Sequence, residues 1–446
     1  MQSAPLRMDR IEVANYRCFT RLALELDPAL TVIVARNGCG KTAVLDAIAV
    51  ALGPFVGAFD EAKGTHFAAA DARLVRNPDT ALAEMEGQYP VILSAEGLVD
   101  GRAETWQREL AGAKAHTSYA EARPLMDYGK HLQRVVRDAA DGRGSPPVLP
   151  LVSYYGTGRL WSEMRLTAGK KADIQTSRLV GYTDCLASAS RYKSFADWFE
   201  RLCRAEYEER ESPASLAAVR NQLAAIQAAV DTVLRPSGWH SIAFKSTEAG
   251  IVAAHDEHGV LPVAWLSDGI RTLIGLAADI AHRAVRLNSH LGSQAVRSTP
   301  GIVLIDEVDM HLHPDWQQVI VESLRGAFPR LQFVVTTHSP QVLSTVRRQH
   351  VRLLAADGSA SIPDDGTYGA ESSRVLEEVF GVHTRPPAVP VVSDLRRYLT
   401  LIEEGRAAAP EAQALRTALE DALGRSDPDL QLADIRASQL QALGRR

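Results

Sequence analysis

The chain has 446 residues, of which 46% are hydrophobic and 23% charged, and its net charge is −5. This composition excludes a disordered or fibrous protein, and the charge excludes an overall electrostatic attraction to nucleic acid, although a local basic face would be compatible with it. No apolar run approaches the roughly 20 residues that cross a bilayer, and the first residues lack the apolar core of a signal peptide. The four cysteines lack the spacing of a zinc site and fit a reducing compartment. We therefore expect a cytoplasmic protein without a membrane partner.

The first part of the chain predicts strands that lead into a glycine-rich turn. Residues 10–19 and 22–26 alternate apolar and polar side chains, as strands with one buried face do. Residues 30–34 form a β-branched apolar run that is typical of a buried central strand. After the turn, the apolar spacing at 42–52 predicts a helix that the Gly-Pro pair at 53–54 stops.

The middle of the chain predicts further strands and then a helical region. Residues 85–110 are strand-like, residues 116–140 are helical, and a buried strand at 148–153 leads into Tyr-Tyr-Gly-Thr-Gly-Arg-Leu-Trp at 154–161. Residues 176–235 are mostly helical, and their apolar stripe has three- and four-residue spacing. The stripe is long enough for a short arm but too short for a long coiled coil.

Strands and helices alternate in the remainder. The predicted elements are strands within 241–264, a helix at 266–290, a strand at 301–305, a helix at 314–327, a strand at 331–336 and a helix that begins at 340. This alternation indicates an α/β core with a largely parallel sheet.

The strand at 30–34 runs into Ala35-Arg-Asn-Gly-Cys-Gly-Lys-Thr42. The strand–turn–helix context suits a phosphate-binding loop, because backbone amides can wrap a phosphate and the helix N-terminus faces its negative charge. We expect Lys41 to contact the β- and γ-phosphates of a nucleotide and the Thr42 hydroxyl to hold Mg²⁺. Ala35 stands where the usual pattern has glycine, so a chance glycine-rich turn stays an alternative for this loop taken alone. The predicted nucleotide contacts are Asn37, Gly38, Cys39, Gly40, Lys41 and Thr42.

The strand at 301–305 ends in two carboxylates, Asp306 and Glu307. Asp306 is suited to organise Mg²⁺ through its water shell, and Glu307 to polarise an attacking water, a role worth roughly 10²–10⁴ in rate. Many strands end in such a pair at the solvent boundary, so the prediction depends on the phosphate-binding loop that precedes it.

Two other motifs are ambiguous when each is taken alone. His338 follows the strand at 331–336, and a lone histidine there is more often an interior residue with satisfied hydrogen bonds. Its position at the carboxyl end of a second central strand favours a γ-phosphate contact. A Leu-Ser-Asp-Gly motif begins the helix at 266 and could bind an anion, whereas an N-capping serine is the simpler interpretation. The residues of this motif are Leu266, Ser267, Asp268 and Gly269.

The order of these four motifs resembles that of the ABC ATPase superfamily, whose signature is Leu-Ser-Gly-Gly-Gln. Asp268 and Ile270 replace a glycine and the glutamine here. In that superfamily the signature of one subunit completes the ATP site of another. The resemblance therefore implies an ATPase that uses ATP and Mg²⁺, with a homodimer enclosing ATP in two composite sites. No Q-loop glutamine is identified, and residues 153–161 are the candidate for its place.

Further motifs narrow the resemblance. Asn15-Tyr-Arg-Cys-Phe19 and Thr337-His-Ser-Pro340 resemble the SMC/Rad50/RecF and OLD-like branch. Motifs at 53–60, 154–161, 266–269, 367–369 and 385–386 resemble virulence-associated ATP-binding proteins and the ATPase subunits of Septu-type and retron-associated antiphage systems. This resemblance spans nearly the whole chain, and the string at 154–161 is its most specific element. Those ATPases partner a small HNH nuclease. The resemblance thus implies a regulatory subunit that controls such a nuclease through ATP-dependent dimerisation, and it admits retron RNA–DNA or another nucleic acid as a partner.

The architecture implied by the resemblance is an ABC-type ATPase head, with a largely parallel central sheet, an antiparallel β lobe, a short helical insertion and a helical C-terminal tail. The expected parts are residues 1–165 and 241–386 for the two parts of the head, 166–240 for the helical insertion and 387–446 for the tail. We expect the tail to dock a partner or a dimer mate, and a helical cap on the core is the simpler alternative.

A DNA repair or maintenance ATPase of the SMC/RecF type is the alternative function. Arginine pairs at 347–348 and 396–397 could contact duplex DNA, although a solvated surface explains them equally well. A transporter ATPase is disfavoured by the opening motif.

Overall fold

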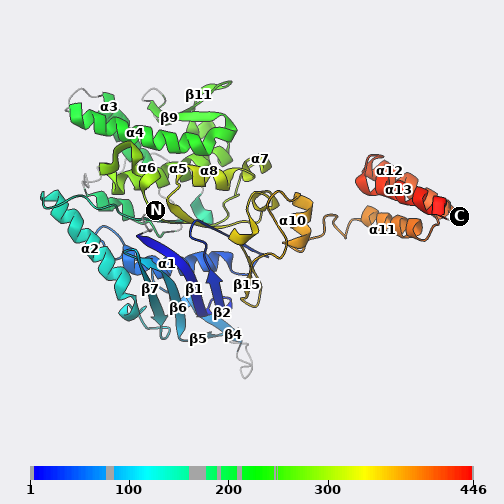
Figure 1. Ribbon diagram of the computed structural model, residues 1–446, viewed down its shortest axis with the longest axis horizontal. Coiled ribbons are helices and arrows are strands. Elements are labelled where there is room, and N and C mark those ends of the chain that lie inside the picture. The colour runs from blue at the N-terminus through cyan, green and yellow to red at the C-terminus, as the bar shows by residue number, and fades with distance from the viewer. Residues whose placement is uncertain are drawn as a thin grey trace. The chain divides into compact units, whose positions relative to one another are not determined.

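The computed structural model describes residues 5–76, 85–159, 177–187, 192–207, 213–245, 248 and 250–443. The chain forms two compact units, Met1–Val375 and Leu376–Arg446 (Figure 1). Leu160 and Trp161, the end of the Tyr-Tyr-Gly-Thr-Gly-Arg-Leu-Trp string, lie outside the described residues.

A six-stranded sheet lies at the centre of the larger unit, in the order β15-β14-β3-β13-β12-β8. All neighbouring pairs are parallel except β14 with β15. Four of these strands, β3, β8, β12 and β13, are buried at every residue, as their apolar runs predict. Their carboxyl ends share one edge of the sheet, so the segments that follow them meet there. The strands are β3 Leu30–Ala35, β8 Leu151–Tyr155, β12 Gly301–Ile305, β13 Leu331–Thr336, β14 Val351–Leu354 and β15 Ala360–Ser361.

Antiparallel strands form a second lobe in the order β2-β1-β6-β7. Along β6 every second residue is buried, which gives the sheet one face toward α1, the helix that follows β3. The strands are β1 Leu6–Tyr16, β2 Phe19–Glu25, β6 Val91–Val99 and β7 Arg102–Leu110, with β4 Arg73–Arg76 and β5 Met85–Gln88 paired beside them. A mostly parallel sheet with an antiparallel lobe confirms the predicted fold class.

Helix α1, Lys41–Val56, does not stop at the Gly-Pro pair as predicted but continues through Pro54. A proline inside a helix leaves the carbonyl four residues earlier without its usual donor. Here that carbonyl, Val50 O, accepts a hydrogen bond from Arg108 Nη1 at 3.0 Å. Because a buried arginine of β7 supplies the missing donor, the prediction from the local sequence was wrong.

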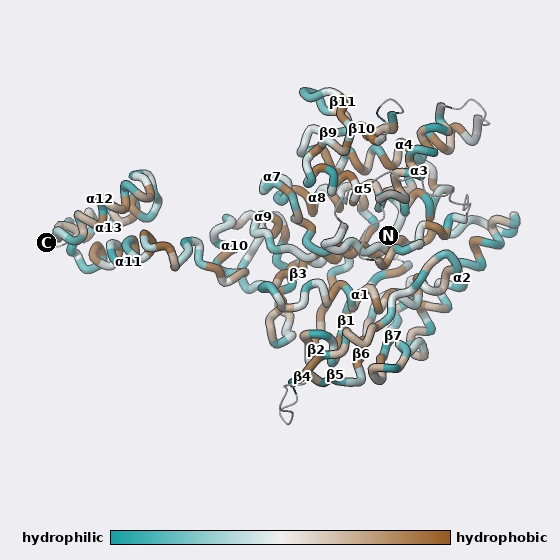
Figure 2. Tube along the Cα trace, turned by 180° about the vertical axis from the view of Figure 1, so that it is seen from behind, coloured by the Kyte–Doolittle hydropathy of each residue, from teal (hydrophilic) through white to brown (hydrophobic). Residues whose placement is uncertain are grey.

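Helix α2 packs on α1 and β7, whereas a separate group of helices packs around α4 and α5. Helix α4 packs against α5 and α8, and Figure 2 shows the three beside one another with apolar segments among them. The helix predicted at 314–327 is two helices, α7 and α8. The helices are α2 Arg123–Ala140, α3 Tyr192–Tyr207, α4 Pro213–Leu234, α5 Asp268–Leu287, α6 Ala295–Ser298, α7 Pro314–Gln317, α8 Ile320–Ala327, α9 Pro340–Leu343 and α10 Ser372–Glu378, with a small sheet of β9 Trp239–Lys245, β10 Gly250–His255 and β11 Gly259–Pro262.

The smaller unit is a helical hairpin with a third helix, α11 Pro390–Glu403, α12 Pro410–Leu423 and α13 Pro428–Leu443. Each begins with proline, whose missing N–H costs nothing at a helix start. This unit has an apolar core of its own, in which Leu401, Leu419 and Leu430 are fully buried. Across both units, no helix among the described residues is long and apolar enough to cross a membrane.

Candidate nucleotide-binding site

The loop between β3 and α1 has the backbone that a phosphate-binding loop requires. Gly38 and Gly40 have φ of 81° and 88°, a left-handed conformation that glycine adopts without strain. Gly40 is the N-cap of α1, and it has no side chain that could accept a hydrogen bond from the first amides of the helix. The first amides of α1 therefore remain available to an anion. Asn37 is exposed and Cys39 partly buried.

Lys41 lies beneath this loop with only 8% of its surface exposed. Its Nζ donates to Ala35 O at 3.3 Å and to His338 Nε2 at 2.5 Å. Burial lowers the pKa of Lys41, and the nearby Asp306 carboxylate opposes that shift. Burial and the Lys41 charge lower the pKa of His338, so the imidazole is neutral at pH 7 and can accept this hydrogen bond. The structure thus joins the predicted lysine and histidine, which are 297 residues apart.

Asp306 connects α1 to the central strands. It is 1% exposed, and it accepts from Thr42 Oγ1 at 2.7 Å and from Thr336 Oγ1 at 2.6 Å. A hydroxyl beside a carboxylate is an oxygen donor set of the kind that Mg²⁺ prefers. The two predicted metal residues, Thr42 and Asp306, are therefore adjacent and fit the ion in chemical type.

Glu307 follows with a φ of 49°, which is unusual for a residue other than glycine. Its backbone N–H donates to Thr336 Oγ1 at 2.7 Å. Two residues later, Asp309 accepts from Thr337 Oγ1 at 2.6 Å. Sequence reasoning missed the roles of Thr336, Thr337 and Asp309, although the two threonines directly precede the predicted histidine.

Further hydrogen bonds hold α1 in place one turn beyond Thr42. Asp46 accepts from Arg17 Nη1 at 2.5 Å and from the Tyr154 hydroxyl at 2.9 Å. Arg17 also donates from Nε to Asp71 Oδ1 at 2.8 Å. Burial, with the Asp46 charge next in size, raises the pKa of Tyr154. Arg17 and Tyr154 both belong to strings that the sequence singled out, but nothing in the sequence pointed to Asp46.

The Leu-Ser-Asp-Gly motif lies at the start of α5. Ser267 is the N-cap, but its side chain makes no capping bond, and Asp268 pairs with Arg271. A Cβ on Gly269 would lie 2.6 Å from His311 O, so this glycine permits close packing against the segment that follows β12. Trp265, just before the motif, is 74% exposed.

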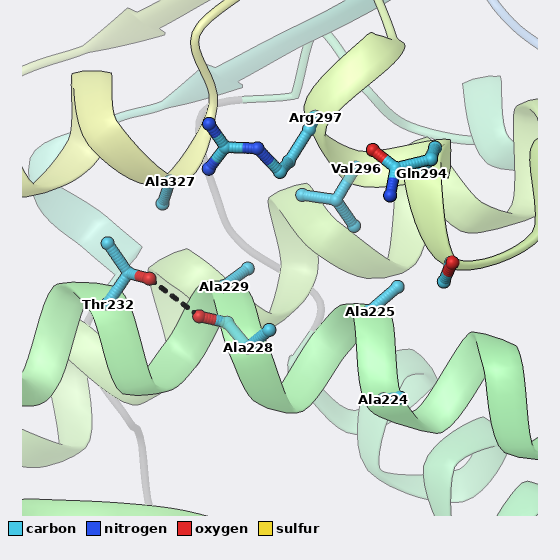
Figure 3. A pocket seen from close by; sticks show the side chains of 10 residues that line it. Ala224, Ala225, Ala228, Ala229, Thr232, Gln294, Val296, Arg297 and Ala327 are labelled. Atoms are coloured by element: carbon cyan, nitrogen blue, oxygen red, sulfur yellow. Dashed lines mark hydrogen bonds between the residues drawn. The ribbon is translucent and has the colours of Figure 1, made fainter.

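A cavity of about 300 Å³ lies elsewhere, between α4 and the α6 region (Figure 3). Alanines of α4 form one wall, and Val296 and Arg297 form the other. No carboxylate and none of the predicted site residues lines it. The candidate site for a nucleotide and its metal is therefore the edge of the central sheet and not this cavity.

Two family models match the chain. One, an AAA domain, covers residues 10–231, and the other, an AAA domain with the description putative AbiEii toxin, Type IV TA system, covers residues 205–344. Together they span all four motifs. The chain is 26% identical over 502 residues to the retron Ec83 probable ATPase of Escherichia coli, covering 96% of this chain and 86% of the relative.

Shorter stretches match two further proteins, and a solved structure aligns over most of the chain. The Septu protein PtuA of Bacillus mycoides (strain KBAB4) is 36% identical over 142 residues, 30% of this chain and 19% of that protein. The DNA replication and repair protein RecF of Acidothermus cellulolyticus is 33% identical over 95 residues, 21% of each chain. A solved SMC head bound to the C-winged helix domain of ScpA aligns with a TM-score of 0.48 at 14% identity, covering 80% of this chain and 97% of that one. The chain is an ATPase related to retron and Septu proteins.

Proposed function

We propose that this ATPase is the regulatory subunit of a bacterial antiphage complex in the cytoplasm and controls a small HNH-type nuclease through ATP-dependent dimerisation. The observation that carries the proposal is the similarity to a retron ATPase along 96% of the chain. The partial similarity to Septu PtuA supports the same class of system. A retron RNA–DNA molecule or another nucleic acid is a further partner in this proposal.

The residues at the sheet edge have distinct roles in this proposal. The amides at 37–42 bind the phosphates, and Lys41 exchanges its present acceptors for the β- and γ-phosphate oxygens. Thr42 and Asp306 hold Mg²⁺, which supplies positive charge to the phosphates when bound. Glu307 orients and polarises the attacking water, and His338, neutral and beside Lys41, contacts the γ-phosphate.

A second copy completes the site in this proposal. Ser267 and Asp268 are exposed at the start of α5, where the helix N-terminus suits an anion. Across a homodimer, the motif at 266–269 would face the γ-phosphate bound to the partner. ATP then acts as the link between subunits, and its hydrolysis releases them. Slow turnover would suit such a switch.

The proposal is tested by phage protection and by partner capture. Lys41→Ala and Glu307→Gln are expected to abolish protection, because the first removes a phosphate contact and the second the catalytic carboxylate. Lys130→Ala on α2 and Glu322→Gln on α8 are matched controls at exposed positions and should protect normally. Unchanged plaque counts for both site variants would refute the proposed role of ATP. A pull-down of the tagged chain with its neighbouring gene products should recover an HNH protein.

An SMC/RecF-like ATPase that binds duplex DNA is the second candidate, and the match to RecF favours it. Recovery of the chain alone in the pull-down, with ATPase activity stimulated by DNA and DNA binding weakened by salt, would support this candidate instead.

A further inference from the structure

The tip of the β1–β2 hairpin rests on the phosphate-binding loop. A Cβ built on Gly40 would lie 2.5 Å from Cys18 Sγ and 2.5 Å from a ring carbon of Phe19. Cys39 directly precedes Gly40, so the fold brings two cysteines, 21 positions apart in the sequence, to one place. Burial raises the pKa of the Cys18 thiol, and the Cys39 thiol adds to the rise, which is consistent with two neighbouring sulfurs.

These two thiols are also the accessible ones. Cys18 is exposed and Cys39 partly exposed, whereas Cys185 and Cys203 are buried. Burial raises the pKa of Cys185 to about 12 and that of Cys203 to about 11, and it keeps an oxidant in solution away from both thiols. An oxidant in solution therefore meets the pair at the loop first.

We propose that Cys18 and Cys39 are an oxidation site, and that a disulfide between them blocks nucleotide binding. With hydrogen peroxide as the oxidant, one thiolate attacks a peroxide oxygen, the O–O bond breaks, and a sulfenic acid and one water form once the leaving hydroxide takes up a proton. The second thiolate attacks the sulfenic sulfur, the S–S bond forms, and hydroxide leaves and becomes the second water. Two thiols and one peroxide thus give one disulfide and two waters.

The disulfide would fasten the loop to a rigid support. Arg17, next to Cys18, donates to both Asp46 and Asp71, and its N–H donates to Asp71 O at 2.8 Å. These bonds fix the hairpin tip to α1 and to the segment at 71. A phosphate-binding loop has to close its amides around a phosphate, and a covalent bond from Cys39 to this tip opposes that closure. The inference rests on the proposed phosphate-binding role of the loop.

The test uses the full-length chain treated with hydrogen peroxide, with and without later dithiothreitol. Mass spectrometry of unreduced peptides should find a peptide pair linked through Cys18 and Cys39. The affinity for a fluorescent ATP analogue with Mg²⁺ should fall at least about tenfold, a change that corresponds to 1.4 kcal/mol, and return on reduction. Bound ATP should slow the reaction because its phosphates occupy the loop.

Cys18→Ala is the decisive variant, because Cys18 lies outside the loop, and Cys203→Ala is its matched control. Cys18→Ala should keep its ATP affinity under peroxide, while Cys203→Ala should lose it as the wild type does. Equal inactivation of Cys18→Ala and wild type, or no linked peptide, would overturn the inference while leaving the loop's role intact. Failure of the reduced wild type to bind the analogue would overturn the phosphate-binding role itself, and the inference with it.

Discussion

Thr336→Val tests whether one buried hydroxyl sets the geometry of both site carboxylates. The Thr336 hydroxyl donates to Asp306 Oδ1 at 2.6 Å and accepts from the Glu307 N–H at 2.7 Å. Valine has nearly the same shape but offers neither bond. The substitution therefore removes a donor to Asp306 and leaves the Glu307 amide without this acceptor. The backbone of Glu307 has a φ of 49°, a conformation that surrounding contacts have to maintain.

The size of the effect follows from these two bonds. A hydrogen bond to a charged group contributes about 1.5–3 kcal/mol, and an unsatisfied buried amide costs about 1–3 kcal/mol. If the whole contribution of the bond to Asp306 is lost from the aligned, reactive arrangement, kcat falls roughly ten- to hundredfold, since about 1.4 kcal/mol is a factor of ten. ATP affinity should change little, because the loop and Lys41 are untouched.

The assay is steady-state ATP hydrolysis together with thermal unfolding. Thr336→Ser keeps the hydroxyl and should restore most of kcat. Thr31→Val is the matched control, since Thr31 is equally buried in the neighbouring β3 and accepts from the Asp27 N–H at 2.8 Å, remote from the carboxyl edge of the sheet. A Thr336→Val enzyme with the kcat of Thr31→Val, or a serine variant as slow as valine, would refute the reasoning.

The remaining predictions concern the loop, the histidine and the tail. Gly40→Ala should lower the melting temperature and the ATP affinity more than Gly38→Ala. Both substitutions add strain of about 1–2 kcal/mol at positive φ. Only a Cβ at Gly40 would in addition overlap the β1–β2 hairpin. For His338 the folded pKa lies below the ordinary 6.5, so its neutral form and the bond from Lys41 persist above pH 6.5 and are lost as the pH falls through the lowered pKa. A pH profile of ATP hydrolysis should show this acid limb, and His338→Gln should lack it; an identical limb in the variant would exclude His338 as its source. Removal of residues 387–446 should leave ATP binding intact, since these helices have their own core, and should abolish capture of a protein partner in the pull-down; undiminished capture would exclude the tail as the docking site.

Local sequence determined the elements around the site. The apolar runs at 301–305 and 331–336 are strands with those bounds, because a continuous β-branched and apolar stretch is stable as a strand only when both of its faces are buried. Parallel strands place their carboxyl ends at one edge, so the motifs that follow them were expected to converge. Lys41, Thr42, Asp306 and His338 do lie together, joined by hydrogen bonds.

Tertiary contacts decided the rest. Pro54 was expected to end α1, but Arg108, from a strand more than fifty residues later, supplies the donor that the helix lacks. The bridging role of Thr336 depends on β12 and β13 being neighbours in register, and the meeting of Cys18 with the loop depends on how a hairpin tip packs. Sequence patterns report which face of an element is apolar, whereas hydrogen bonds and contacts between distant segments depend on positions that are set only when the whole core packs.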